Sequence, residues 1–212
     1  MKKNYTHIVL LIDRSGSMST IKSDMEGGME TFLNEQKKIG GDCTITAAQF
    51  DTEYEILFSR KPIKDIEKIQ IDPRGGTALI DSMSRLIKEV GKDLDSLEES
   101  EKPDRVLFVT ITDGEENSSR EYTNEQLKEM INHQSDSYNW AFSYIGANQD
   151  SFGVAGNMGI SSGSTINYNA STYGINNMFT TLSNATTRYR SVSTGNVTSD
   201  SFSYTEDEQK NN

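Results

Sequence analysis

The sequence predicts an α/β fold in which a doubly wound, mostly parallel six-stranded sheet has one antiparallel edge strand and helices on both faces. Two observations lead to this prediction. Short apolar runs, typical of strands buried on both faces, alternate with longer segments in which apolar residues recur at helical spacing. Two other strand-like runs are separated only by Asp51-Thr52, which indicates a hairpin and therefore one strand that runs against the rest.

Six segments have the character of strands. Residues 8–12, 105–112 and 140–146 are apolar runs rich in β-branched, aliphatic and aromatic residues. The hairpin joins residues 44–50 to residues 53–59, and residues 164–168 form a short last strand. Because helical segments separate most of these runs, most of the strands are expected to be parallel.

Four segments carry apolar residues at every third or fourth position. This spacing predicts helices over residues 21–39, 79–97, 123–131 and 175–189. Gly40-Gly41 ends the first of them. At the start of the third, Thr123 and Gln126 match a capping box, in which two side chains satisfy backbone groups of the first turn.

The chain has 212 residues, enough for one domain with a sizeable core, which we expect to span residues 1–191. From residue 192 both periodicities disappear, and Ser, Thr, Asn, Asp and Glu dominate. Residues 192–212 are therefore predicted to form a polar, disordered C-terminal tail.

The composition excludes several classes of function. A net charge of −11 disfavours binding to nucleic acid or to an anionic membrane. The apolar run over residues 7–12 is too short for a signal peptide, and no segment approaches the roughly 18 apolar residues of a membrane span. The single cysteine, Cys43, allows no internal disulfide and is expected to act as a small buried hydrophobe. We therefore expect a cytoplasmic protein.

Polar residues interrupt the pattern at three places near the predicted carboxyl edge of the sheet. Asp13 follows the first strand, with Ser15 and Ser17 at alternate positions after it. Thr77 lies just before the second helix, and Asp113 directly follows the strand that precedes the third helix. Because open α/β sheets bind ligands outside the carboxyl ends of their strands, we expect these five side chains to converge.

These five side chains offer hard oxygen ligands and neither sulfur nor imidazole. Oxygen-only sites favour Mg²⁺, Mn²⁺ or Ca²⁺ over zinc or copper. Hydroxyl ligands, together with carboxylates that reach the ion through water, would leave the ion under-neutralised and with one position open. Such an ion would attract an anionic oxygen from another molecule.

On these residues the sequence resembles the von Willebrand factor type A family. Asp13-x-Ser15-x-Ser17 matches the metal-ion-dependent adhesion site of that family, Thr77 matches its threonine, and Asp113-Gly114 matches its later aspartate. The resemblance covers about residues 5–190 and looks most like small stand-alone members from bacteria and their phages. It implies a Rossmann-like fold, no catalysis, and a metal site formed by Asp13, Ser15, Ser17, Thr77 and Asp113.

The resemblance also implies a protein–protein interaction module that binds a partner's Asp or Glu carboxylate through Mg²⁺, with Mn²⁺ or Ca²⁺ as alternatives. Two other functions stay open. A Mg²⁺-dependent Rossmann-like phosphotransferase or hydrolase would usually need a second carboxylate two residues after Asp13, where this sequence has Ser15. A structural assembly component would use the metal only to stabilise its fold. Arg14, Met18 and the Gly75-Gly76 loop are expected to flank the site and contact the partner, although Met18 suits the core equally well.

Overall fold

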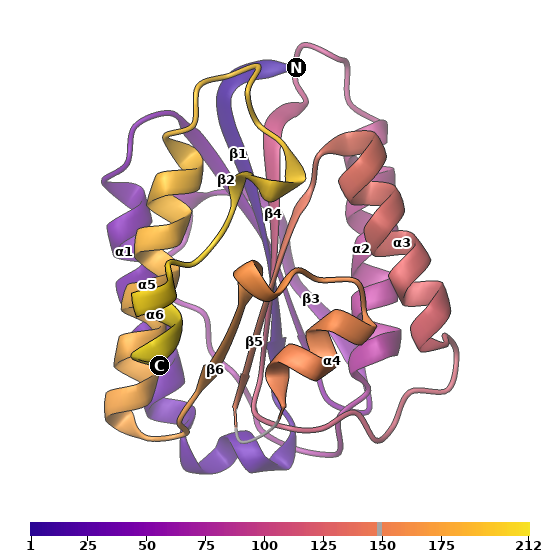
Figure 1. Cartoon of the computed structure of the whole chain (residues 1–212), viewed down its shortest axis with the longest axis vertical. Coiled ribbons are helices and arrows are strands. Elements are labelled where there is room, and N and C mark those ends of the chain that lie inside the picture. The colour runs from indigo at the N-terminus through magenta and orange to yellow at the C-terminus, as the bar shows by residue number, and fades with distance from the viewer. Residues whose placement is uncertain (148–149) are drawn as a thin grey trace.

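The computed structural model describes residues 1–147 and 150–212, and its centre is one sheet with the strand order β3-β2-β1-β4-β5-β6 (Figure 1). The parallel strands are β1 (Lys2–Asp13), β2 (Asp42–Phe50), β4 (Pro103–Thr112), β5 (Ala141–Ala147) and β6 (Thr165–Tyr168). The edge strand β3 (Tyr54–Pro62) pairs antiparallel with β2. The predicted fold class is therefore confirmed, including the antiparallel edge strand.

Helices cover both faces of the sheet (Figure 1). One face carries α1 (Lys22–Lys37), α5 (Thr172–Arg190) and α6 (Glu206–Lys210), and the other carries α2 (Leu79–Asp95), α3 (Asn124–Tyr138) and α4 (Ser151–Asn157). The four predicted helices correspond to α1, α2, α3 and α5, and the capping box of Thr123 and Gln126 is present. The prediction missed α4, whose seven residues include two glycines and too few apolar residues to show helical spacing. No described helix combines the length and apolarity that a bilayer span requires.

Alternation along the central strands explains their unbroken apolar runs. In β1, Ile8, Leu10 and Ile12 belong to the apolar cluster beneath α1 and α5. Val9 and Leu11 belong to the cluster beneath α2 and α3. Since successive side chains of a strand point to opposite faces, a strand covered on both sides must be apolar at every position.

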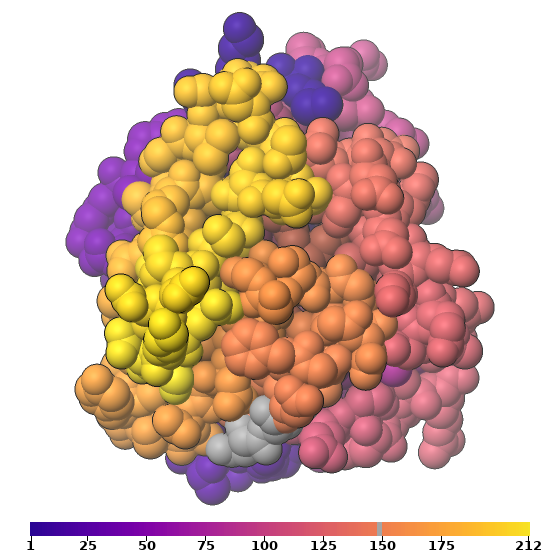
Figure 2. Space-filling view, viewed as in Figure 1, coloured from indigo at the N-terminus to yellow at the C-terminus, as the bar shows by residue number. Residues whose placement is uncertain are grey.

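The C-terminal segment differs from its prediction. Residues 192–212 were expected to be disordered, but Phe202 and Tyr204 are buried in the same apolar cluster as α1 and α5. The Tyr204 hydroxyl lies 2.7 Å from Ser143 Oγ of β5, and Ser164 Oγ donates to the Phe202 carbonyl at 3.0 Å. Figure 2 shows the yellow C-terminal segment lying directly against the orange segments that precede it in sequence. Two aromatic side chains anchor an otherwise polar segment, and two residues are too few to produce a periodic signal.

A buried histidine of β1 lies beside two threonines of the neighbouring strand β2. His7 is completely buried, and its Nδ1 and Nε2 lie 2.9 Å from Thr44 Oγ1 and 3.1 Å from Thr46 Oγ1. Burial, reinforced by the positive charge of Arg60, lowers the pKa of His7 to about 3. The imidazole therefore stays neutral in the folded protein and is bonded to threonines, so its role is structural.

This histidine should make the protein less stable in mild acid. The folded pKa lies below the unfolded value near 6.5, so the stabilisation is complete above about pH 6.5 and is lost as pH falls toward 3. Between pH 7.5 and pH 5 the loss should be about 2 kcal/mol, because only the unfolded chain takes up the proton there. Urea unfolding of the wild type and of His7→Gln at both pH values measures it. His133→Gln, at the exposed second histidine, is the control; equal losses in the wild type and His7→Gln would contradict the prediction.

Candidate metal centre

The five predicted side chains meet at the carboxyl edge of the sheet. Asp13 is the last residue of β1, and Asp113 follows the last residue of β4, the neighbouring strand. Ser15 and Ser17 lie at the start of the 3₁₀ turn η1 (Gly16–Thr20), and Thr77 lies two residues before α2. Adjacency of β1 and β4 thus brings together residues 100 positions apart in sequence.

Hydrogen bonds link four of these side chains into one row. Asp13 Oδ1 accepts the backbone N–H of Ser15 at 2.6 Å, and Ser15 Oγ lies 3.0 Å from Ser17 Oγ. Ser17 Oγ in turn donates to Asp113 Oδ1 at 2.7 Å. The second oxygen of Asp13 accepts a bond of 2.6 Å from Thr112 Oγ1, a residue that the sequence analysis did not select. The row fixes both carboxylates and both serine hydroxyls in one small region.

Gly114 shows how closely Thr77 approaches the same region. A Cβ added at Gly114 would lie 2.9 Å from Thr77 Oγ1 and 3.6 Å from both Asp13 Oδ2 and Ser15 Oγ. Three oxygens from two separate segments therefore surround one point beside Gly114, which belongs to a third segment. A further contact joins the loops, since the N–H of Gly16 donates to the Gly75 carbonyl at 3.1 Å.

Asp13 is buried and Asp113 is half-buried, and neither is paired with a cationic side chain among the described residues. Burial raises the pKa of Asp13 to about 6, with a smaller increase from the nearby Asp113 and an opposing effect of hydrogen bonds from Thr112 and Ser15. Burial likewise raises the pKa of Asp113, against the hydrogen bond from Ser17. Within residues 1–147 and 150–212, neither carboxylate has an ion-pair partner. A bound cation would supply the missing positive charge.

The set of donors fits a hard divalent ion. Asp13, Ser15, Ser17, Thr77 and Asp113 present two carboxylates and three hydroxyls, which are oxygen ligands of the kind that Mg²⁺, Mn²⁺ and Ca²⁺ prefer. The described part of the chain contains no group of three or more His, Cys, Asp or Glu side chains arranged to hold a metal. The hydroxyls are therefore essential members of this set.

Another carboxylate, that of Asp81, fixes the loop after β4 and was not among the residues predicted from the sequence. Asp81, in the first turn of α2, accepts the backbone N–H groups of residues 120–122 at 2.7–3.2 Å. In return, the N–H of Asp81 donates to Ser119 Oγ at 3.0 Å. The start of α2 and the loop that carries Asp113 are thereby connected.

Glu116 and Asn117 complete this connection. Glu116 accepts the backbone N–H of Ile80 at 2.9 Å and those of Ser118 and Ser119 at 2.8 Å each. Asn117 Oδ1 accepts the N–H of Thr77 at 2.9 Å. No local sequence pattern indicates that these two residues bind Thr77 and Ile80, which lie about 40 positions away. The Thr77 loop and the Asp113 loop therefore form one hydrogen-bonded unit.

Two residues expected to contact a partner are instead buried. Arg14 is 3% exposed, and its Nε and Nη1 bind Asp51 at 2.8 Å and Glu55 at 2.6 Å. The expectation for Arg14 was wrong because the β2–β3 hairpin, folded beside the end of β1, supplies these carboxylates. Met18 lies entirely in the apolar cluster beneath α1, which is the core position that its sequence also allowed. Gly75, by contrast, is exposed beside the site.

Several solved structures have folds similar to that of this chain. Proximal thread matrix protein 1 from the mussel byssus, a structure with a zinc-occupied metal-ion-dependent adhesion site, has a TM-score of 0.61 at 14% identity and matches 87% of this chain and 46% of its own. The ArnB paralog VWA2 from Sulfolobus acidocaldarius has a TM-score of 0.55 at 20% identity and matches 87% of this chain and 45% of its own. A von Willebrand factor type A protein from Catenulispora acidiphila has a TM-score of 0.53 at 15% identity, with 87% and 43% of the two chains matched.

The match is one of fold. No family model and no curated protein sequence matches the chain. The chain spans less than half the length of each of the three solved proteins. The similarity nevertheless covers 87% of this chain. The chain has the von Willebrand factor type A fold.

Proposed function

We propose that this protein is a metal-dependent protein-interaction module that binds the Asp or Glu carboxylate of a partner through a Mg²⁺ ion. One observation carries the proposal: a buried and a half-buried carboxylate, neither paired with a cationic side chain in the described part of the chain, lie in one hydrogen-bonded row with serine hydroxyls at the carboxyl edge of the sheet. Asp13 and Ser15 are buried while Ser17 is exposed. The row thus runs from the interior to the surface, where a partner can reach it.

The carboxylates and the hydroxyls of the site have different roles in binding. Asp13 and Asp113 provide negative charge, while Ser15, Ser17 and Thr77 provide neutral oxygens. A divalent ion bound by this set supplies a positive charge that attracts an external carboxylate. Hydrogen bonds of Asp81 and Glu116 hold the loops of Thr77 and Asp113 in fixed positions relative to each other. The loops therefore lose little conformational freedom when a partner binds.

Mg²⁺ is the ion that we propose, with Mn²⁺ and Ca²⁺ as alternatives. The oxygen-only donor set supports this choice. The zinc-occupied site of the mussel protein supports a divalent ion more generally and makes Zn²⁺ a necessary comparison.

We also propose that the protein is not an enzyme. A phosphotransferase acting at this edge would need a carboxylate placed as general acid or base beside Asp13, and the residue in that position is Ser15. Ser15 and Ser17 are bonded to each other and, through Ser17, to Asp113, and no histidine takes part in these bonds. A structural role for the metal remains the second candidate, favoured by the burial of Asp13, and the next two experiments separate it from binding.

Removal of both serine hydroxyls should abolish measurable metal binding. Since loss of even an outer partner of a ligand typically costs 10–100-fold in affinity, loss of two ligands in Ser15→Ala/Ser17→Ala should cost at least about 100-fold. Titration calorimetry with Mg²⁺, Mn²⁺, Ca²⁺ and Zn²⁺ measures the affinity, and thermal melts with each ion report stabilisation by mass action. Ser19→Ala/Ser23→Ala, at two exposed positions nearby, is the matched control. Wild-type protein that binds none of the four ions would refute the metal site.

Partner capture is tested separately. Tagged wild type and the Ser15→Ala/Ser17→Ala variant are incubated with native lysate in Mg²⁺ and in EDTA. A partner held through the metal should be retained only by the wild type in Mg²⁺, and its affinity should then fall by about 2–5 kcal/mol in the variant. Partners retained equally under all conditions would leave the metal with a structural role and place recognition on another face.

A further inference from the structure

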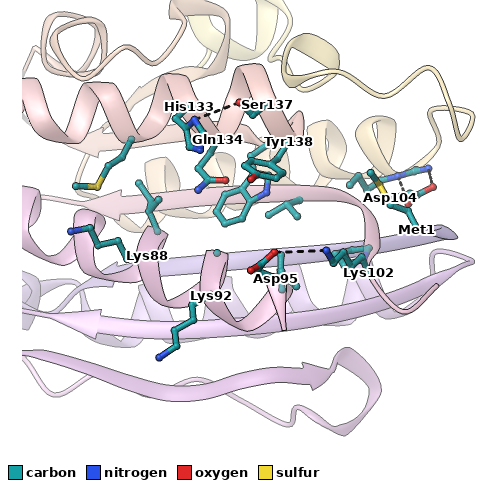
Figure 3. Close-up of a pocket in the computed structure, with 18 of the residues that line it drawn as sticks. Met1, Lys88, Lys92, Asp95, Lys102, Asp104, His133, Gln134, Ser137 and Tyr138 are labelled. Atoms are coloured by element: carbon teal, nitrogen blue, oxygen red, sulfur yellow. Dashed lines mark hydrogen bonds and ion pairs between the residues drawn. The ribbon is translucent and has the colours of Figure 1, made fainter. Parts of the chain in front are cut away.

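A second site lies at the opposite edge of the sheet from Asp13. A pocket of about 740 Å³ opens between α2 and α3, beside the first residues of β4 (Figure 3). Its volume falls in the range of about 300–1,000 Å³ that is typical of small-molecule sites. The proposed interaction site at the carboxyl edge makes no use of this pocket.

The interior of the pocket is apolar and the upper side is aromatic. Aliphatic residues and one indole line it: Ile87, Leu94, Val106, Met130 and Trp140. Tyr138, at the end of α3, is 59% exposed and packs against His133 in an edge-to-face arrangement, with ring centroids 5.6 Å apart. An exposed tyrosine above buried apolar side chains offers a flat surface for an apolar or aromatic molecule.

Two donors in the pocket have no acceptor. Trp140 is 3% exposed, yet within the described residues its indole N–H makes no hydrogen bond. The side-chain amide of Gln134 also makes none in that part of the chain, and Figure 3 shows it beside Tyr138 and His133 on the α3 side. Because the indole N–H opens onto the cavity, an oxygen of a ligand or of water can accept its hydrogen bond.

The charges of the pocket also favour an anion. The three acidic residues at its far end each have a cationic neighbour: Lys102 lies 4.0 Å from Asp95, the amino group of Met1 lies 3.4 Å from Glu99, and Arg105 lies 3.1 Å from Asp104. These pairs leave little free negative charge on that side.

Two lysines of α2 remain without a carboxylate. Neither Lys88 nor Lys92 lies within 4.0 Å of one among the described residues; Lys88 instead lies 4.6 Å above the ring of Tyr122. Both occupy the α2 side of the pocket, across from Gln134 and Tyr138 (Figure 3). In a protein with a net charge of −11, a pocket whose unpaired charges are positive is a local exception that selects for negative ligands.

We propose that this pocket binds a small amphipathic anion: a molecule with an apolar or aromatic body that lies between α2 and α3 and a carboxylate, sulfonate or phosphate within reach of Lys92. The body replaces water on Ile87, Met130 and the ring of Tyr138. An oxygen of the ligand accepts the Trp140 indole N–H.

Anilinonaphthalene sulfonate is a suitable probe, and its uncharged parent phenyl-naphthylamine tests the need for charge. Because the chain contains one tryptophan, a single indole N–H resonance reports directly on the pocket. We expect the sulfonate to shift this resonance and to become fluorescent at micromolar to low millimolar concentrations, and the uncharged compound to bind at least about fivefold more weakly.

Gly91 allows the pocket to be filled without removing any of its groups. A Cβ at this position of α2 would meet only Gln134 Nε2, at 3.5 Å, so a leucine can enter the helix and project into the cavity. Gly91→Leu should weaken binding of the sulfonate at least about tenfold. Gly27→Leu is the matched control, because a Cβ at that position of α1 meets nothing within 4 Å.

Charge reversal provides the second test. Lys92→Glu should weaken the sulfonate about fivefold or more and leave phenyl-naphthylamine unchanged, whereas Lys64→Glu, on an exposed residue elsewhere, should change neither. Near-ultraviolet circular dichroism confirms that each variant is folded. Absence of binding by the wild type, or equal binding by Gly91→Leu, would overturn the proposed site. Equal binding of the charged and uncharged probes would overturn its preference for anions.

Discussion

A chain that ends after Arg190 should unfold at a lower temperature than the full-length protein, or show no cooperative unfolding transition at all. The reason is that it lacks two aromatic side chains of the core. Phe202 and Tyr204 are 1% and 5% exposed, and each contacts the apolar cluster beneath α1 and α5. Loss of a buried aromatic side chain costs about 3–5 kcal/mol, and a whole domain is stable by only about 5–15 kcal/mol. Scanning calorimetry of the two chains measures the effect.

Single substitutions distinguish the aromatic anchor from the rest of the segment. Phe202→Ala in the full chain should lower the free energy of unfolding by about 3–5 kcal/mol. Phe152→Ala, at a phenylalanine that is 41% exposed, should lower it by less than about 1 kcal/mol and serves as the control. Loss of the exposed ion pair between Arg188 and Glu208 should matter little as well. A truncated chain as stable as the full one would show that residues 192–212 are dispensable.

Substitution of Gly114 by alanine should weaken metal binding although the substitution removes none of the proposed ligand residues. The new Cβ would lie 2.9 Å from Thr77 Oγ1, which is closer than such atoms normally approach, so Thr77 or the loop must move. Because a displacement of ligands by a few tenths of an ångström disturbs the near-octahedral geometry that Mg²⁺ demands, affinity should fall on the order of 10–100-fold. Titration calorimetry and the metal-induced rise in melting temperature measure this loss.

Gly40→Ala is the matched control for this prediction. Gly40 lies in a loop, its φ is not positive, and a Cβ there would meet nothing within 4 Å. Both variants should fold, since neither glycine has a positive φ, and circular dichroism checks this; only Gly114→Ala forces a neighbouring group to move. Metal affinity unchanged by Gly114→Ala would mean that the ion does not bind beside Gly114, even if it binds elsewhere in the protein.

Much of the fold follows from local patterns. The unbroken apolar run at residues 8–12 predicted a central strand, and the two-residue turn at Asp51-Thr52 predicted the antiparallel edge; both were confirmed. The short helix α4 and the burial of residues 202–204 had no comparable signal. The spacing of apolar residues identifies only segments that bury apolar side chains at regular intervals. It therefore cannot identify a short glycine-containing helix or a polar segment anchored by two aromatic side chains.

The candidate site shows the same division. Order along the chain and the rule that ligands bind at the carboxyl ends of strands were enough to predict that Asp13, Ser15, Ser17, Thr77 and Asp113 would converge. Their role as metal ligands stays a prediction. Asp81 and Glu116 were not selected, because each resembles an ordinary surface carboxylate until its backbone partners are known.

The sequence by itself determined the strands, the main helices and the set of oxygen-bearing residues, because each depends on neighbours only a few positions away. Tertiary structure decided which charges are free. Arg14, expected at a binding surface, is neutralised by Asp51 from the next hairpin, whereas Asp13 and Asp113 lie together without a cation and Lys92 lies beside an apolar pocket without a carboxylate. The energy of a charge depends on burial and on partners within a few ångströms, and those partners come from segments that only the folded chain brings near.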